Sequence, residues 1–237
     1  MKMTRKPTRR EREAADQRRT ARQRKTHLIW AAGIVAVAAV AVLIVAGGLL
    51  RDDGKVQTVS AAQRDGRVLG EKSAPVIITA WEDFQCPVCK AANSSTLATI
   101  IQEYVDTGKV QLQYRYYSFL GDESVRAAEA AEAAAAQGKF WEYHDALYTY
   151  QGAENSGAFS DDRLTQLAQL VGLDLTQFEA SLDSGEYEGV VEDELAEGQM
   201  LGVMSTPTFF VNGAQVEDWR DVDAFRALID SLLPAGS

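Results

Sequence analysis

The chain has 237 residues, of which 46% are hydrophobic and 24% charged, which suits one globular domain or two modest ones with a sizeable core. Its net charge of −10 averages two opposite regions, because residues 1–27 carry eleven Lys or Arg against three acids, while residues 51–237 carry 13 against 31. The charge pattern therefore excludes a uniformly acidic protein, and each region needs its own interpretation.

Residues 28–50 form an uncharged stretch of 23 residues, built from Leu, Ile, Val, Ala and Gly with a single Trp. As an α-helix the stretch would measure roughly 34 Å, enough to cross a hydrocarbon core of about 30 Å. It predicts a transmembrane helix, with Trp30 as an aromatic anchor at its basic end. A cleaved signal peptide is the alternative, and Ala46-Gly47-Gly48 is its weak candidate cleavage site.

The basic residues 1–27 predict the orientation of this helix in the membrane. Positively charged flanks stay in the cytoplasm, so residues 51–237 are expected outside it, on a single-pass protein of the cell membrane. Nucleic-acid binding is the weaker explanation of the basic tail, because a membrane span directly follows it. We therefore expect the lipid bilayer, held through residues 28–50, as a partner, and no nucleic acid.

Beyond the predicted membrane helix, residues 51–66 are polar and indicate a linker, and apolar content rises from Arg67 onward. A folded domain is expected over residues 67–237, and its pattern predicts a small α/β layer with a helical insertion in the middle. The expected elements are a buried strand Val76–Trp81, a helix Val88–Asp106, a strand Val110–Phe119, four or five helices over about 122–201, strands Thr208–Asn212 and Ala214–Glu217 around an Asn212-Gly213 turn, and a closing helix Asp221–Leu233.

The two cysteines of the chain lie three positions apart, in the motif Cys86-Pro87-Val88-Cys89 at the start of a predicted helix. This spacing brings both sulfurs to one side of the first helical turn, close enough to form a disulfide. Unpaired backbone N–H groups and the helix dipole at this end stabilise a thiolate and lower its pKa. We expect a redox-active dithiol in which Cys86, the more exposed sulfur, is the nucleophile and Cys89 resolves the mixed disulfide.

Other uses of a cysteine pair fit the sequence less well. A zinc site needs about four ligands, and His144 is the one histidine on the predicted outer side of the membrane. Haem attachment needs a histidine directly after the second cysteine, where Lys90 stands. A purely structural disulfide stays an alternative, although so short a loop would constrain the unfolded chain little. Neither a metal ion nor another cofactor is therefore expected.

The segment Ser205-Thr206-Pro207-Thr208 lies directly before a predicted strand. A proline at the first position of a strand that should pair internally indicates a turn or a cis peptide bond. An ordinary trans proline at a strand entry is the alternative. If the bond is cis, this segment is a second feature, distant in sequence, that belongs with the cysteine motif.

Four segments together carry a family resemblance: Gly70 with Ala74-Pro75-Val76, the motif Glu82–Cys89, Phe140–Asp145 and Gly202–Gly213. They resemble the DsbA-like thiol:disulfide oxidoreductases of the thioredoxin superfamily, and more narrowly the membrane-anchored members of Gram-positive and actinobacterial type. The resemblance covers about residues 67–233. The cysteine motif and the Ser-Thr-Pro-Thr segment, at this separation in the sequence, form a combination that is specific for this family.

The resemblance implies a thioredoxin fold with an inserted helical domain, in which Pro207 is a cis-proline that faces the dithiol. It further implies that Thr206, with Pro87 and Val88, binds an extended substrate. The implied activity is the oxidation of cysteine pairs in reduced secreted proteins, with re-oxidation by a membrane partner that is vitamin K epoxide reductase-like or quinone-linked. A disulfide reductase or isomerase and a non-catalytic tethered chaperone are the alternatives.

The sequence departs from the family pattern at two positions. Family members carry a buried acid six residues before the first cysteine, where this chain has Ala80. Glu82 and Asp83 are the candidate substitutes, but their side chains are expected to face solvent. Val88 stands where strong oxidants carry a histidine that stabilises the thiolate, which predicts a more reducing couple. His144 lies in an aromatic helix and is expected to be structural.

Overall fold

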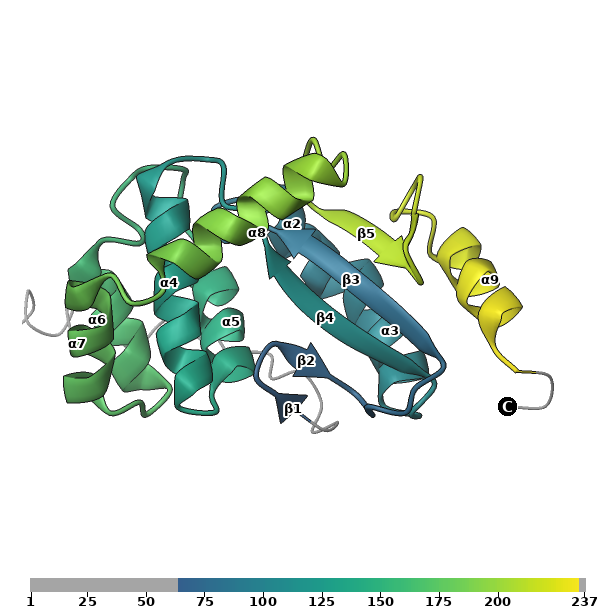
Figure 1. Cartoon of the computed structure of the whole chain (residues 1–237), viewed down its shortest axis with the longest axis horizontal. Helices are drawn as coiled ribbons and strands as arrows, with labels where there is room; N and C mark the ends of the chain where they lie inside the picture. The colour runs from purple at the N-terminus through teal and green to yellow at the C-terminus, as the bar shows by residue number, and fades with distance from the viewer. Residues whose placement is uncertain (1–63, 235–237) are drawn as a thin grey trace, which may run out of the picture. The chain divides into compact units, whose positions relative to one another are not determined.

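A computed structural model describes residues 64–234 of the chain (Figure 1). The basic tail predicted over residues 1–27, the transmembrane helix predicted over 28–50 and most of the predicted linker lie outside the described residues and stay predictions. Among the helices of residues 64–234, none combines the length and the apolar character that a membrane crossing requires.

A six-stranded sheet lies at the centre of the described part of the chain, in the order β1-β2-β4-β3-β5-β6. The strands β3 (Val76–Glu82) and β4 (Val110–Tyr116) pair in parallel, and β5 (Thr208–Val211) pairs antiparallel with β3. Three two-residue strands extend the two edges: β1 (Arg64–Asp65), β2 (Val68–Leu69) and β6 (Ala214–Gln215). Strand β1 lies within the stretch predicted as a linker and pairs with β2.

The central strand β3 separates two faces of the sheet by simple alternation. Val76, Ile78 and Ala80 are buried on one face, while Ile77 and Thr79 on the other face keep some solvent exposure. A run of β-branched residues suits such a pleated, largely covered position. The same alternation places Glu82 on the face of Ala80, which matters for the site below.

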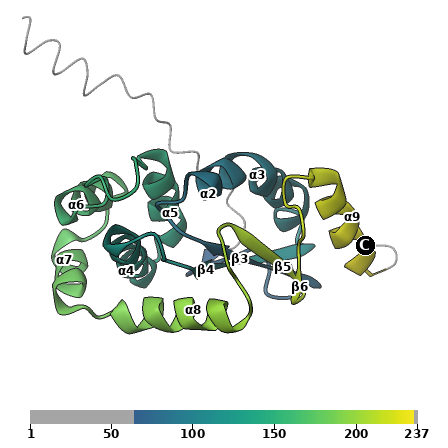
Figure 2. The same cartoon turned by 90° about the horizontal axis from the view of Figure 1, so that it is seen from above.

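Helices cover the two faces unequally (Figure 2). The connection from β3 to β4 and the closing helix α9 lie on one side of the strands, and α8 lies on the other. Two π-helical turns interrupt the single helix expected after the cysteines. The hydroxyl groups of Ser94, Ser95 and Thr99 donate to carbonyl oxygens four residues earlier. These hydrogen bonds compete with the regular backbone pattern of an α-helix. The bounds are α2 (Pro87–Ala92), η1 (Asn93–Leu97), α3 (Ala98–Ile100), η2 (Ile101–Val105), α8 (Glu188–Met200) and α9 (Val222–Leu232).

The helical insertion between β4 and β5 confirms the expected thioredoxin-type layer with an inserted helical region. It consists of α4 (Asp122–Ala136), α5 (Phe140–Thr149), α6 (Asp161–Leu170), α7 (Leu175–Ser184) and α8, which returns the chain to the sheet. Helix α4 packs against α5, α6, α7 and α8, and its alanines are buried at these contacts. The alanine-rich sequence is therefore explained by close helix packing together with high helix propensity.

Candidate active site

The dithiol lies where β3 ends and α2 begins. Cys86 is the N-cap residue of α2, and Pro87 occupies the first turn, where a missing N–H costs little. Both cysteines are free thiols, and the backbone N–H of Cys89 donates to Cys86 Sγ at 3.4 Å. Cys86 is 6% exposed and Cys89 is fully buried, so Cys86 is the sulfur that an incoming group can reach.

The Thr206-Pro207 peptide bond is cis and lies beside the dithiol. The Cys86 thiol donates to the carbonyl oxygen of Thr206 at 3.5 Å, across 120 positions of sequence. This contact brings together two segments that the sequence analysis had linked only through the family resemblance. The expected cis bond is confirmed, and the expected trans alternative is wrong.

The two thiols have opposite electrostatic surroundings. The pKa of Cys86 is lowered to about 6, chiefly because the Cys89 thiol hydrogen-bonds to the thiolate, with further support from the side chain of Thr206 and from backbone N–H groups. Burial opposes this shift but does not prevail. The pKa of Cys89 is raised well above its ordinary value by burial first, and then by Cys86 and by the charge of Glu82. At neutral pH the pair therefore holds one thiolate, on Cys86, and one thiol, on Cys89.

Exposed apolar side chains lie in the cysteine turn and in the segment before the cis-proline. Val88 is 37% exposed next to Cys86, and Met204, which precedes the cis-proline segment, is 88% exposed. Pro87 is also exposed, while Thr206 is half-buried. Pro87 and Val88 follow Cys86 directly and Thr206 contacts it, while Met204 is an exposed apolar residue two positions before Thr206 that the sequence analysis missed.

Glu82 and Asp83 do not face solvent, so that expectation is wrong: both residues are fully buried. The reason is tertiary, because the chain after β4 and the start of α4 close over this end of β3. Asp83 accepts hydrogen bonds from the backbone N–H groups of Phe119 and Leu120 and from the hydroxyl of Ser124. Burial raises the pKa of Asp83, and these hydrogen bonds oppose the rise. Asp83 therefore ties the cysteine turn to the segment that leads into α4.

Glu82 occupies a different environment, on the inner side of the dithiol. Its Oε2 atom accepts hydrogen bonds from Asn93 Nδ2 at 2.6 Å and from the hydroxyl of Tyr148 at 2.7 Å. Burial raises the pKa of Glu82, and the charge of His144 is the main opposing influence. Ala80 stands two residues earlier on the same face, so this chain carries a buried acid near the dithiol at a shifted position.

Several of these neighbours escaped the sequence analysis. Asn93 and Tyr148 contact Glu82, and Gln151 Nε2 donates to the carbonyl oxygens of Phe84 and Cys86. One local signal was available: His144 and Tyr148 are four residues apart and so share one face of α5. No local pattern could show that this face would meet β3.

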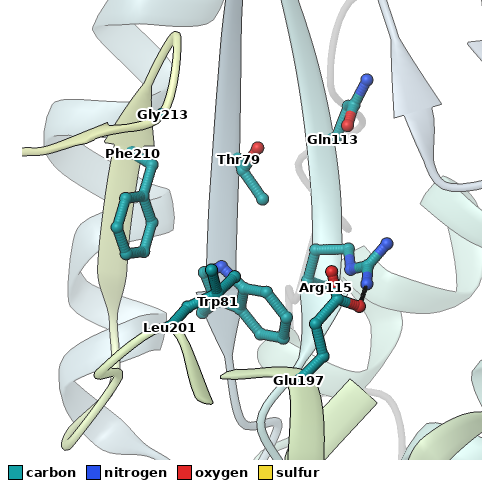
Figure 3. A pocket seen from close by; sticks show the side chains of 8 residues that line it. All are labelled: Thr79, Trp81, Gln113, Arg115, Glu197, Leu201, Phe210 and Gly213. Carbon is teal, nitrogen blue, oxygen red and sulfur yellow. Dashed lines mark hydrogen bonds and ion pairs between the residues drawn. The ribbon is translucent and has the colours of Figure 1, made fainter. Parts of the chain in front are cut away.

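The opposite face of the sheet carries a separate hollow of about 210 Å³ (Figure 3). Trp81 and Thr79 of β3 point into it, away from the face of Glu82, and Arg115 pairs with Glu197 of α8 at its rim. The residues that line this hollow are Thr79, Trp81, Gln113, Arg115, Glu197, Leu201, Phe210 and Gly213.

Among residues 64–234, no group of three or more His, Cys, Asp or Glu side chains is arranged to hold a metal ion.

Comparison with known proteins assigns the chain and its fold to a family. The thioredoxin family model Thioredoxin_4 matches residues 62–231. A probable disulfide bond formation protein D of Bacillus cereus is 31% identical over 220 residues, which cover 88% of this chain and 99% of that protein. The chain belongs to the DsbA-like thioredoxin family. As a member of this family it is a thiol:disulfide oxidoreductase.

Two crystal structures of family members are similar to this chain. Oxidised BdbD from Bacillus subtilis has a TM-score of 0.67 and 25% sequence identity, covering 74% of this chain and 98% of BdbD. Reduced DsbA from Mycobacterium tuberculosis has a TM-score of 0.56 and 26% identity, covering 73% of this chain and 91% of that one.

Proposed function

We propose that this DsbA-like protein oxidises cysteine pairs of secreted proteins through a disulfide between Cys86 and Cys89. The observation that carries the proposal is the stabilised Cys86 thiolate, whose pKa is lowered to about 6 by the Cys89 thiol above all. A couple whose reduced form contains a stabilised thiolate gives up its disulfide readily and is the stronger oxidant. The Pro-Val dipeptide lacks a histidine, but Cys89, Thr206 and backbone N–H groups supply the stabilisation instead.

The proposed reaction consists of two exchanges. A substrate thiolate attacks Cys86 Sγ of the disulfide form, a mixed disulfide forms, and the electron pair of the broken bond leaves on Cys89 Sγ. A second substrate thiolate then attacks the substrate sulfur of the mixed disulfide, and Cys86 leaves as a thiolate. The substrate loses two electrons and gains a disulfide. Cys89 takes up one proton from solvent, so the enzyme ends with the thiolate on Cys86 and the thiol on Cys89.

The proposed substrate is an extended, reduced segment of a secreted protein. The exposed apolar groups of Val88, Pro87 and Met204 suit side chains that are exposed only before folding. The backbone of Thr206 beside cis-Pro207 is the proposed docking edge for this segment. Pro207 would act by holding that edge at the distance of the sulfur, and not by chemistry of its own.

The proposed location is the outer side of the cell membrane. Residues 28–50 would anchor the chain in the lipid bilayer, with residues 1–27 in the cytoplasm and residues 51–66 as a spacer below the domain. The relative from Bacillus cereus carries the name of a disulfide bond formation protein, which fits an oxidising compartment. We propose a membrane redox partner of the vitamin K epoxide reductase or quinone-linked kind, which would regenerate the disulfide.

The reduction potential of the Cys86–Cys89 pair tests the direction of the reaction. Equilibration with glutathione should give a potential well above about −270 mV, the value of thioredoxin. A potential at or below that value would overturn the oxidase and leave a reductase. The variant Cys86→Ser separates the enzyme from a tethered chaperone, since it should not restore disulfide formation in cells that lack the protein. A mature N-terminus found near Leu49 would disprove the anchor.

A further inference from the structure

The side-chain amide of Gln151 contacts the backbone of the cysteine turn from the loop that follows α5. Gln151 is half-buried and lies two residues after the end of that helix. Its Nε2 donates to the carbonyl oxygen of Phe84 at 2.7 Å and to that of Cys86 at 3.0 Å. Because an amide NH2 group has two protons to donate, both are used by carbonyl groups two positions apart in the turn that leads into α2.

The loop that carries Gln151 is itself held against the cysteine turn on both sides of this residue. Gln85 is 2% exposed and exchanges two hydrogen bonds with Asn155. The backbone N–H of Asn155 donates to Gln85 Oε1 at 2.6 Å, and Gln85 Nε2 donates to Asn155 Oδ1 at 3.2 Å. Before the loop, Lys90 Nζ of α2 donates to the carbonyl oxygen of Thr149 at 3.3 Å. The fold therefore fixes the position of the Gln151 amide from both directions along the chain.

Cys86 is held at its backbone as well as at its sulfur. Its carbonyl oxygen accepts from Gln151 and, at 3.2 Å, from the backbone N–H of Lys90, which is the first helical hydrogen bond of α2. Its Sγ atom lies 3.5 Å from the carbonyl oxygen of Thr206. Disulfide exchange needs the attacking sulfur to approach in line with the bond that breaks, so its rate depends on the direction of this Sγ atom.

We propose that Gln151 is a positioning residue for thiol–disulfide exchange, whose amide holds the carbonyl groups of Phe84 and Cys86 and so keeps the Cys86 sulfur in line with Cys89 and the incoming thiolate. Gln151 acts through Cys86 and touches no reacting atom. In the step that it supports, a bond forms between the incoming sulfur and Cys86 Sγ, and the electron pair of the broken disulfide leaves on Cys89 Sγ. Gln151 gains and loses neither a proton nor an electron. The inference rests on the proposed use of Cys86 and Cys89 as the exchanging pair, but not on the direction of the exchange.

A second glutamine shows what a purely structural role looks like in this chain. The Gln137 amide donates to the carbonyl oxygen of Asp174 at 3.2 Å and accepts from the N–H of Asp174 at 2.8 Å, which joins the end of α4 to the start of α7. Gln151 instead uses both donors on the turn of the nucleophile. That turn is already closed by the backbone hydrogen bond from Cys86 N–H to the Asp83 carbonyl oxygen at 3.0 Å, so Gln151 adds orientation to a turn that forms without it.

The test measures how fast a model peptide with two free cysteines reduces the Cys86–Cys89 disulfide of the full chain. Acid quenching and mass spectrometry over a range of peptide concentrations give the rate constant at saturation and the half-saturating concentration separately. Gln151→Met keeps the length of the side chain but loses its donors. Its saturating rate constant should fall about tenfold while the half-saturating concentration changes by less than about twofold, because poor alignment slows the step that follows binding. Gln151→Glu brings a carboxylate toward the same two carbonyl oxygens and should be at least as slow.

Gln137→Met is the matched control for these variants. It loses a contact between a glutamine amide and the backbone of the same kind, but within the helical insertion. It should lower the unfolding temperature and leave both kinetic constants as in wild type.

Two kinetic results would overturn the inference. An unchanged saturating rate constant in Gln151→Met would leave the contact without effect on the exchange, and a change confined to the half-saturating concentration would make Gln151 part of the peptide-binding surface. If neither variant at this position folds, NMR of the wild-type protein decides. The side-chain amide protons of Gln151 should exchange with water more slowly than those of the exposed Gln102, and equal exchange would overturn the inference. A low reduction potential would overturn the oxidase but not the role of Gln151, which the ratio of the rate constants decides.

Discussion

Two buried carboxylates lie on opposite faces of the sheet, and their surroundings differ in kind. Glu194 of α8 pairs with Arg67 at 2.7 Å and with Arg115 at 3.0 Å, and it also accepts from the backbone N–H of Tyr116. Glu82, on the dithiol face, has neutral donors at one oxygen and no partner at the other among the described residues. Permanent cations surround the first carboxylate, and titratable groups surround the second.

This difference separates a carboxylate that is paired with permanent charges from one whose pKa is raised by burial. An arginine stays protonated at any pH that the protein meets, so the ion pairs of Glu194 with Arg115 of β4 and with Arg67 hold α8 against the sheet. Glu82 has only neutral hydrogen-bond donors, and burial raises its pKa, so its carboxyl group is less strongly held in the ionised form. Four variants test this comparison, from the largest expected effect to the smallest.

Replacing Glu194 should have the largest effect on stability. The variant Glu194→Ala removes the acid that Arg67 and Arg115 share and the acceptor of the Tyr116 N–H. Because Arg67 keeps Glu132 and Arg115 keeps Glu197, the expected cost is about 1.5–3 kcal/mol, the range for hydrogen bonds to charged groups. Urea unfolding of the reduced protein measures the change. Glu192→Ala, an exposed site on the same helix, is the matched control and should change little. A change in the pKa of Cys86 in Glu194→Ala would contradict the separation of the two carboxylates.

Helix α8 also approaches the sheet closely at Gly198. A Cβ atom there would come within 2.7 Å of the Tyr117 ring and 3.1 Å of Trp81, so Gly198→Ala should cost about 1–3 kcal/mol. Gly189→Ala on the same helix meets nothing within 4 Å and should raise stability by up to about 1 kcal/mol through helix propensity. Thermal unfolding measures the stability of both variants. Equal changes in the unfolding temperature would contradict close packing of α8 at Gly198.

The thiolate of Cys86 should depend on its partner cysteine. In the reduced wild type, the rate of alkylation by iodoacetamide should rise with pH and level off above about 6. In Cys89→Ala the main stabilising hydrogen bond is lost, so the pKa of Cys86 should move back toward its ordinary value and the plateau toward alkaline pH. Ser94→Ala, an exposed change one turn later, is the control. An unmoved plateau in Cys89→Ala would assign the stabilisation to the backbone alone.

The smallest expected effect is a change in how stability depends on pH. Burial raises the pKa of Glu82 in the folded state, so its contribution is fully present at acidic pH, below the pKa of the unfolded chain, and is lost as pH rises through the raised value. Glu82→Gln removes this loss, and its stability should fall less between mildly acidic and alkaline pH. Urea unfolding at several pH values measures the slope, with Glu129→Gln as control. The same slope in Glu82→Gln and wild type would contradict a buried, raised pKa.

The cysteine motif and the order of elements were predictable because they depend on short-range patterns. Two cysteines three apart at a helix start, β-branched runs and a long helical block are each readable from neighbouring residues. The proline before β5 indicated a turn or a cis peptide bond. The family resemblance implied that this proline lies beside Cys86. Alternation along β3 already put Glu82 on the inner face with Ile78 and Ala80, a signal that the sequence analysis did not use.

Taken by itself, the sequence determined a dithiol at the start of a helix and a thioredoxin-type α/β order with a helical insertion. It also predicts a membrane anchor. Only the tertiary structure decided the charge of each sulfur and the burial of Glu82. The reason is that α5, more than 50 residues after Glu82, brings His144 and Tyr148 against the end of β3. Local pattern determines which face of an element is apolar, but the pKa of a buried group depends on what the rest of the chain packs against it.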